Sequence, residues 1–346
     1  FIIRSVIFRC IAGFLWLFAQ LPMSAFAQDL PTGAILVPKR LYSSLPKANA
    51  PPGAALGEPV VTLRPDFPPP GNQGLRLQSC TAFAVAYAVE TYLQKKESGW
   101  KDFSDQHISS PSFIYNQFAN NHGSRGIYIR QALNIVESGG SVSLATMPYD
   151  PNDADTGPSE QMINDAAVSK LNIRTDPLKV FDVDTVKSYL VSQIPIVVGA
   201  KVDTANQGQW EKNSKGVTDG YLPSGHLGSH CMVVIGYDDS KEAFEILNSW
   251  GSAWNDNGYG WISYKFWPDW ANEAYTVQLT GKADLPPAAN VTASQLKAIP
   301  IGPEGRSNGN WGYPAGMALS ELRTTIDKKL SPEVKKFFPA NYRPGQ

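Results

Sequence analysis

The chain is poor in cysteine, in histidine and in net charge. Its 346 residues include 3 cysteines and 4 histidines, and 30 basic residues balance 31 acidic ones. Balanced charge gives no reason to expect a nucleic-acid partner, because proteins that bind nucleic acid carry a basic surface. The sequence also indicates no metal site and no cofactor. Few side chains are therefore left that can carry nucleophilic or acid–base chemistry.

Long hydrophobic runs are equally scarce. Residues 1–27 combine Arg4 and Arg9 with an apolar run from Cys10 that ends in Ala25-Phe26-Ala27. The run is about half of the ~20 apolar residues that a membrane-spanning helix needs. We predict a signal peptide that is cut before Gln28, with export to the periplasm or secretion and no stable membrane insertion afterwards. An uncleaved anchor is the alternative.

Cleavage there would leave two cysteines, Cys80 and Cys231, which could form a bridge in an exported protein. The first of them begins an almost wholly apolar stretch that carries no charge until Glu90. A helix that is apolar on every side is a buried one. Cys80 would then lie at a helix N-terminus, where the dipole favours a thiolate. The alternative is a small, inert, buried side chain.

The order of the predicted elements indicates an α+β fold in which a helical half and a β half face each other across a cleft. The expected helices are Cys80–Gln94, one opening at Ser110-Pro111, Ile127–Glu137, Ser159–Leu171 and Asp184–Gln193. The expected strands are Val60–Leu63, Ile194–Val202, His230–Tyr237, Ala243–Leu247, Tyr259–Tyr264 and Ala274–Leu279.

A cysteine nucleophile needs a base and a group that orients the base. His230 opens the apolar strand Cys231–Ile235 and is the favoured base, with His226 as the alternative. Asn248 directly follows a strand, and a buried amide there would fix the histidine tautomer. Trp250 would shield that hydrogen bond from water.

These segments together resemble the papain-like cysteine peptidases. The resemblance rests on Asn72-Gln73-Gly74 with Ser79-Cys80-Thr81-Ala82-Phe83, on His230 with Gly236-Tyr237, and on Asn248-Ser249-Trp250-Gly251 with Trp254. His230 follows Cys80 by about 150 residues, within the family's downstream range of ~130–150, and Asn248 lies somewhat farther. The chain lacks the family's cysteine shortly before the nucleophile.

The resemblance implies a papain-like domain over residues 58–282, with a helical half at about 75–175 and an antiparallel, β-barrel-like half at about 176–282. Residues 28–57 would be a short pro-segment or linker, and if the enzyme is latent we expect either this segment in the cleft or a partner to be the cause. Residues 283–346 would form a C-terminal extension of unknown role. That extension could dock on the domain or recruit a protein inhibitor or another partner.

The resemblance also implies a cysteine endopeptidase acting on polypeptides. Cys80 and His230 would form a thiolate–imidazolium pair at rest, Asn248 would orient His230, and Gln73 would stabilise the oxyanion, with Gln78 as the alternative. Five further residues would contact substrate: Gly123, Gly126, Ser229, Cys231 and Trp250. Because Ser229 and Cys231 are uncharged, we expect an apolar substrate residue two positions before the cut.

Two other functions fit parts of the pattern. A papain-like domain without activity could serve as a binding module, although all four polar site residues are present. Another Cys–His acyl transferase or amidase is the second alternative, and the Asn-Ser-Trp-Gly segment counts against it.

If this mechanism holds, Gln73→Ala lowers the hydrolysis rate by ~10²–10³, because one oxyanion donor is lost. Cys80→Ala abolishes hydrolysis, because no nucleophile remains. Steady-state hydrolysis of a fluorogenic peptide by both variants measures the difference, and equal losses would contradict these roles.

Overall fold

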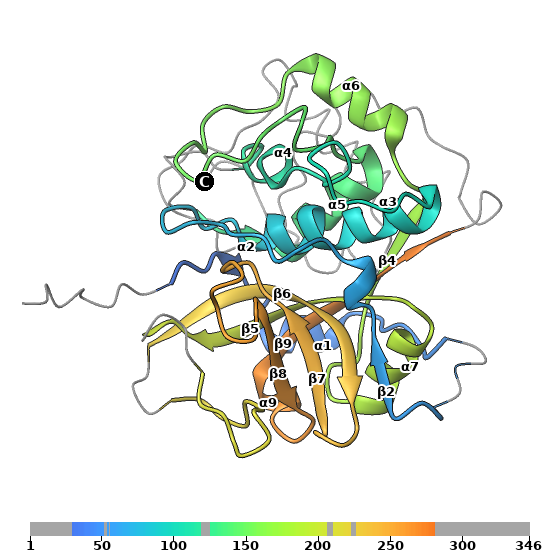
Figure 1. Ribbon diagram of the computed structural model, residues 1–346, viewed down its shortest axis with the longest axis vertical. Helices are drawn as coiled ribbons and strands as arrows, with labels where there is room; N and C mark the ends of the chain where they lie inside the picture. The colour runs from blue at the N-terminus through green and yellow to red at the C-terminus, as the bar shows by residue number, and fades with distance from the viewer. Residues whose placement is uncertain are drawn as a thin grey trace, which may run out of the picture.

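The computed structural model describes residues 30–280, apart from 52–53, 55, 119–124, 206–209 and 223–225. The predicted signal peptide, the C-terminal extension and Gly123 lie outside these residues. Figure 1 shows two halves, one built from helices and the other from an antiparallel sheet, with α2 between them. This is the α+β arrangement that the element order predicts.

A single continuous helix runs through the centre. It consists of α2 (Cys80–Ala82), the π-helical η2 (Phe83–Glu90) and α3 (Thr91–Ser98). Every residue of α2 and η2 except Tyr87 is buried. The helix extends four residues beyond its predicted end through an exposed last turn of Lys96, Glu97 and Ser98, and it stops at Gly99, which has φ +71°.

The remaining helices surround this central one or line the sheet. They are α1 (Lys39–Ser44), η1 (Arg64–Asp66), α4 (Pro111–Tyr115), α5 (Ile129–Gly139), α6 (Glu160–Ser169), α7 (Val183–Val191) and α9 (Trp267–Trp270). Ser110 caps α4 as expected, since its hydroxyl accepts from Phe113 N–H at 3.3 Å. Helix α5 begins two residues later than predicted, because β3 (Ile127–Tyr128) pairs instead with β1 (Ala34–Ile35).

The β half is one antiparallel sheet in the order β4-β9-β5-β6-β7-β8, with β2 added to β6. Its strands are β2 (Val60–Thr62), β4 (Ile173–Pro177), β5 (Ile196–Asp203), β6 (Leu227–Asp238), β7 (Ala243–Leu247), β8 (Tyr259–Ser263) and β9 (Ala271–Leu279). Within the described part of the chain no pairing joins β4 to β8, so the expected barrel-like half is an open sheet rather than a closed barrel.

Strand β4 was not among the predicted strands. Its inward residues Ile173 and Thr175 alternate with exposed Arg174, but Asp176 and Pro177 are poor strand formers. Pairing with β9 stabilises it, from Ile173 opposite Leu279 to Pro177 opposite Tyr275. Because β9 lies about 100 residues away in sequence, the local pattern of residues does not predict β4.

The segment before the domain is anchored to the sheet. The Tyr42 hydroxyl of α1 donates to the Leu178 carbonyl at 2.7 Å and accepts from Leu178 N–H at 3.0 Å. It also contacts the carbonyl and N–H of Ala274 on β9. Tyr42 is 2% exposed, so these groups would be unsatisfied without it. Residues 30–50, which we call the lead, are therefore part of the folded domain.

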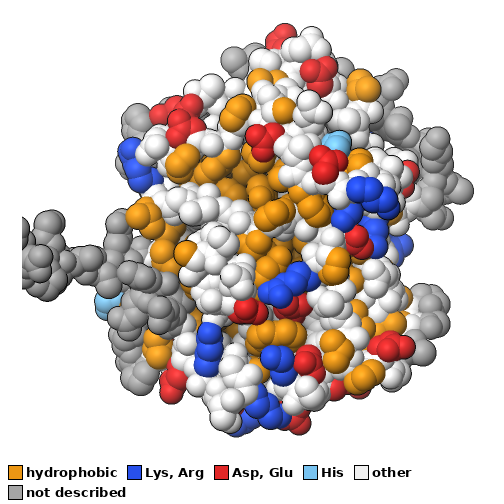
Figure 2. Space-filling view, viewed as in Figure 1, with side chains coloured by type: hydrophobic (Ala, Val, Ile, Leu, Met, Phe, Trp, Pro, Cys, Tyr) orange, Lys and Arg blue, Asp and Glu red, His pale blue; other side chains and the backbone are white. Residues whose placement is uncertain are grey.

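None of the helices in the described residues is long and apolar enough to cross a membrane. On the face drawn in Figure 2, hydrophobic side chains gather in the middle, where the helical half meets the sheet.

Ile246→Ala tests the packing of the sheet. Ile246 lies on β7 between β6 and β8 with none of its surface exposed, so its truncation is expected to lower the free energy of unfolding by about 2–5 kcal/mol. Urea unfolding followed by tryptophan fluorescence measures the loss. The matched control Val168→Ala, at a side chain that is 90% exposed, should change stability by less than about 0.5 kcal/mol.

Candidate active site

Cys80 is the first residue of the central helix, as the sequence predicts. Its thiol therefore lies at the end of the helix where N–H groups and the dipole favour a negative charge. Ser79 occupies the cap position, but its hydroxyl bonds the Tyr149 hydroxyl at 2.8 Å and caps no helix N–H. Ser79 therefore does not cap the helix with its side chain, because Tyr149 offers the hydroxyl a competing partner.

The Cys80 thiol is fully buried. Burial raises the pKa of the thiol to about 12, because a thiolate would lose its hydration. Backbone N–H groups of Cys231 and Ala34 and the Thr81 hydroxyl offset part of this effect by hydrogen bonding. In this state Cys80 is a neutral thiol.

His230 lies on β6 and is also fully buried. Its Nε2 is 2.7 Å from Asn248 Oδ1, and since the amide oxygen can only accept, Nε2 carries the proton. Burial lowers the pKa of His230 to about 4, although the Asn248 contact raises it. Among the described residues Nδ1 has no hydrogen-bond partner, so its lone pair is free to take a proton.

Desolvation by the surrounding protein opposes the thiolate–imidazolium pair that the resemblance implies at rest. Both groups favour their neutral forms, and no hydrogen bond joins Cys80 to His230 Nδ1 in the described residues. The physical reason is desolvation, which penalises two buried charges more than their attraction repays unless the geometry is very good.

Asn248 and Trp250 hold the imidazole from two sides. Asn248 Oδ1 also accepts from Ser249 N–H at 2.7 Å, which fixes the amide orientation. The Trp250 ring stacks on the His230 ring with centroids 4.5 Å apart and an interplanar angle of 28°. The tryptophan therefore covers the imidazole and keeps water from the Nε2 hydrogen bond.

Gln73, the favoured of the two glutamines, has its side chain among the residues of the site. Gln73 Nε2 donates to the carbonyls of Thr32 and Leu77, each at 3.2 Å, and its Oε1 accepts from the Ser249 hydroxyl at 2.8 Å. The two carbonyl oxygens can only accept, so they settle which end of the amide is nitrogen. Gln73 thus points an N–H donor at a carbonyl that lies in the cleft.

The carbonyl bound by Gln73 belongs to the lead. Trp250 Nε1 donates to the Pro31 carbonyl at 2.8 Å, and Gly33 N–H donates to the Ser229 carbonyl at 3.0 Å. Ile127 N–H donates to the Gly33 carbonyl at 3.0 Å, so β1 lies alongside β3 in parallel. Residues 31–35 therefore cover Cys80 and engage the groups that we assigned to catalysis and substrate binding.

Glycine is required where the lead crosses the cleft. Gly33 has φ +131°, and a methyl group built on it would lie 2.1 Å from the Gln78 carbonyl oxygen. A methyl group on Gly126 would lie 2.0 Å from the Gly33 carbonyl oxygen. The two backbones touch with no room for a side chain on either.

The structure brings the other expected substrate residues to the same place. The Ser229 hydroxyl accepts from Lys201 Nζ at 2.7 Å, next to its carbonyl contact with Gly33. Cys231 is buried and is a free thiol, as is Cys80, so the alternative of a bridge between them is not realised. His226 is exposed at the edge of the sheet, unlike the buried His230.

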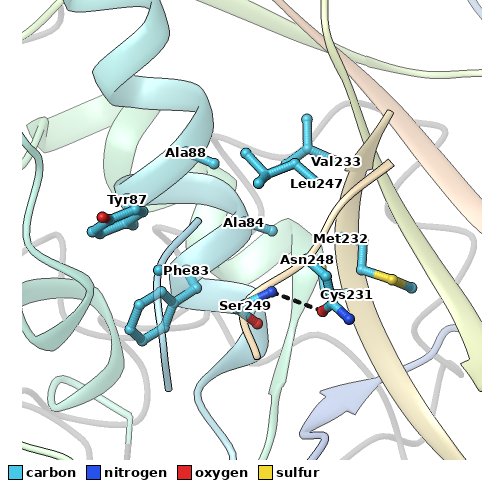
Figure 3. Close-up of a pocket in the computed structure, with 11 residues that line it drawn as sticks. Phe83, Ala84, Tyr87, Ala88, Cys231, Met232, Val233, Leu247, Asn248 and Ser249 are labelled. Carbon is cyan, nitrogen blue, oxygen red and sulfur yellow. Dashed lines mark hydrogen bonds between the residues drawn. The ribbon is translucent and has the colours of Figure 1, made fainter. Parts of the chain in front are cut away.

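Figure 3 shows an apolar pocket between η2 and strands β6 and β7. Its lining includes Phe83, Ala84, Met232 and Leu247, with Asn248 and Ser249 at its polar end. No group of three or more His, Cys, Asp or Glu that could hold a metal ion occurs in the described residues. The apolar side chains that line the pocket therefore pack behind the turn at Asn248.

Sequence reasoning missed Glu273 on β9. This carboxylate has none of its surface exposed; its Oε1 accepts from Val37 N–H at 2.9 Å and its Oε2 accepts from the Tyr275 hydroxyl at 2.7 Å. Burial raises the pKa of Glu273 to about 7. The only local signal was an acidic residue at the start of an otherwise apolar strand.

Comparison with known proteins identifies the family. Residues 70–274, more than half of the chain, match the family model of the papain family cysteine proteases. The chain therefore belongs to the papain family.

Curated relatives agree with this assignment. An uncharacterized peptidase C1-like protein of Acanthamoeba polyphaga mimivirus is 27% identical over 206 residues, which are 56% of this chain and 64% of the relative. Cathepsin S of Mus musculus is 28% identical over 184 residues, which are 52% of this chain and 51% of the relative. The chain thus spans less than two thirds of the length of each.

Solved structures share the fold. Xylellain, a cysteine protease from Xylella fastidiosa, has a TM-score of 0.55 at 23% identity, with 74% of this chain and 98% of xylellain covered. The proform of the ragweed pollen cysteine protease Amb a 11 has a TM-score of 0.51 at 19% identity, covering 70% and 71% of the two chains. The α+β, papain-like fold is thereby established.

The burial of Cys80 predicts low thiol reactivity in the folded chain. At pH 7 iodoacetamide should modify Cys80 at least about tenfold more slowly than a free cysteine, because the pKa is raised and the lead covers the sulfur. The rate should rise with pH as the thiol approaches its raised pKa. Mass spectrometry after timed quenching locates the label, and the urea-unfolded chain is the control. Rapid labelling at pH 6 would mean that an ion pair already exists.

Proposed function

We propose that this chain is a cysteine endopeptidase that hydrolyses peptide bonds through Cys80, His230 and Asn248 and a covalent acyl-enzyme, and that its lead holds it latent. The observation that carries the proposal is the His230 Nε2–Asn248 Oδ1 contact of 2.7 Å, which leaves Nδ1 free to accept a proton. Membership of the papain family supports the reaction class.

The reaction begins when the lead leaves the cleft. Water then reaches Cys80 and His230, which reduces the desolvation that keeps them neutral. The proton moves from the Cys80 sulfur to His230 Nδ1, and the helix N-terminus stabilises the thiolate. Asn248 stabilises the imidazolium by accepting from Nε2–H.

The thiolate then attacks a substrate carbonyl carbon and forms a tetrahedral oxyanion. Gln73 Nε2, released from the Thr32 carbonyl, donates to this oxyanion together with the Cys80 N–H. His230 protonates the leaving amine as the C–N bond breaks, and the acyl group stays on the Cys80 sulfur. His230 next takes a proton from water, whose attack frees the carboxylic acid and restores the thiol.

Covalent labelling tests the activity. An epoxide thiol-protease inhibitor under reducing conditions should modify Cys80 and not Cys231, and peptide hydrolysis should stop in proportion to labelling. Tandem mass spectrometry identifies the site. A chain that is never labelled at Cys80 and hydrolyses no peptide, even with the lead displaced, would instead favour a binding module.

Gly33→Ala tests latency without altering the catalytic groups. The added methyl group would meet the Gln78 carbonyl oxygen, and alanine is strained at φ +131°, so the lead should be displaced from the cleft. Strain of about 1–3 kcal/mol predicts a rise in hydrolysis of ~5–150-fold. The rate of epoxide labelling at Cys80 should rise in parallel.

Gly57→Ala is the matched control, because a methyl group there meets nothing within 4 Å. Its hydrolysis rate should equal that of the unaltered chain. If a folded Gly33→Ala chain, checked by its thermal unfolding midpoint, hydrolyses no faster than the control, the lead is not an inhibitor.

A further inference from the structure

We infer that Tyr149 is a positioning residue of the oxyanion site: its hydroxyl joins Gln73 to the residue before Cys80 and so holds the two oxyanion donors at a fixed separation. This inference rests on the proposed peptidase function, in which Gln73 Nε2 and the Cys80 N–H bind the oxyanion. Tyr149 acts through Gln73 and Ser79 and is not itself a donor to the oxyanion.

The Tyr149 hydroxyl makes two hydrogen bonds whose directions are fixed. It lies 2.8 Å from the backbone carbonyl oxygen of Gln73 and 2.8 Å from the Ser79 hydroxyl. A carbonyl can only accept, so the single Tyr149 proton points at Gln73 and the Ser79 hydroxyl donates to Tyr149. The bonds therefore run from Ser79 through Tyr149 to Gln73, and each one polarises and strengthens the next.

Gln73 is held from both halves of the molecule. Its N–H donates to the Ser249 carbonyl at 2.9 Å, and its side-chain Oε1 accepts from the Ser249 hydroxyl, in the turn after β7. Its carbonyl accepts from Tyr149, which belongs to the helical half. Gln73 has none of its surface exposed, so this carbonyl would lose a partner without gaining water if the Tyr149 hydroxyl were absent.

Ser79 connects the same hydroxyl to the second donor. Ser79 is fully buried, and its carbonyl accepts from Phe83 N–H at 3.1 Å in the first turn of the central helix. The peptide group between Ser79 and Cys80 carries the Cys80 N–H. Tyr149 is therefore bonded to the residue next to one oxyanion donor and to the backbone of the residue that supplies the other.

The Tyr149 ring is also fixed in place. It packs edge-on against the ring of Phe83, which lines the pocket in Figure 3, with centroids 4.7 Å apart and an interplanar angle of 85°. Two residues earlier, the Met147 carbonyl accepts from the Ser110 hydroxyl at 2.6 Å. Burial raises the pKa of Tyr149, so the hydroxyl keeps the proton that it donates at neutral and mildly alkaline pH.

Tyr149→Phe tests the inference because it removes the hydroxyl and keeps the ring contact with Phe83. Hydrolysis of a fluorogenic peptide is measured in the Gly33→Ala chain, in which the lead should be displaced, and in the unaltered chain. We expect kcat to fall by about tenfold and KM to change by less than about twofold, because a misplaced donor weakens transition-state binding more than substrate binding.

Alkylation of Cys80 by iodoacetamide separates positioning from a general disturbance of the site. The thiolate displaces iodide in this reaction and forms no oxyanion, so its rate in Tyr149→Phe should stay within about twofold of the parent chain. In a chain that already carries Gln73→Ala, Tyr149→Phe should lower kcat by less than about threefold, because the donor that it positions is absent.

Ser79→Ala removes the group that donates to Tyr149. It should lower kcat without slowing alkylation, and it should cause no further loss in a Tyr149→Phe chain, because both changes break the same series of bonds. If Tyr149→Phe does not fold, Ser79→Ala decides the question, and an unchanged kcat in that variant would overturn the inference.

Tyr92→Phe is the matched control. Tyr92 is fully buried on α3, and its hydroxyl also donates to a backbone carbonyl, that of Gln193, at 2.8 Å. Its loss should lower the thermal unfolding midpoint as Tyr149→Phe does, but should leave kcat unchanged.

The outcomes separate the two proposals. A folded Tyr149→Phe chain with unchanged kcat, or one in which hydrolysis and alkylation fall by the same factor, would overturn the positioning role and leave the peptidase function standing. If no form of the chain hydrolyses a peptide and no epoxide labels Cys80, the peptidase function fails, and this inference fails with it.

Discussion

The packing of the apolar helix that begins at Cys80 against strand β6 is the constraint on which the rest depends. A helix buried on nearly all sides cannot shift without opening the core, so the position of Cys80 relative to His230 is fixed by the same contacts that stabilise the fold. That burial also removes water from the thiol and the imidazole. One packing arrangement therefore fixes the positions of both groups and, while the cleft is covered, favours the neutral form of each.

The lead also excludes water from the site, and the hydrogen bonds that hold it there come from its backbone. The peptide groups of residues 31–33 form hydrogen bonds with Trp250, Gln73 and Ser229. The site thus binds a segment of its own chain. Farther along, the Leu36 side chain contacts the sheet at Gly199, and the backbone N–H of Val37 donates to Glu273. The lead belongs to the same chain as the cleft, and Tyr42 anchors it to the sheet. This tethering raises the effective concentration of the lead at the cleft.

Much of the site could be predicted from sequence because its residues stand at recognisable local boundaries. Cys80 begins an uncharged helix, His230 precedes the apolar run of β6, and Asn248 follows β7 directly. The α+β order of elements was equally readable. Strand β3 and the late start of α5 were not, because they depend on pairing with a lead about 90 residues earlier.

The sequence also could not reveal the ionisation of the site or the burial of Glu273. A helix N-terminus suggests a thiolate, but the opposing effect of burial depends on which segment covers the sulfur. Glu273 resembles an ordinary surface acid in the sequence and becomes distinctive only when Gly199 is found opposite it. Both features arise from contacts between residues far apart in the chain.

The distance in sequence between the lead and its binding surface affects when activity can first arise. The lead is synthesised early, whereas β6 and β9, which bind it, follow roughly 200 residues later. Contacts between such distant segments form late in folding, because they require closure of long loops. The sheet that completes the catalytic site is also the surface that receives the lead. Under the proposed latency, a newly made chain would therefore reach its native state with the lead already in the cleft.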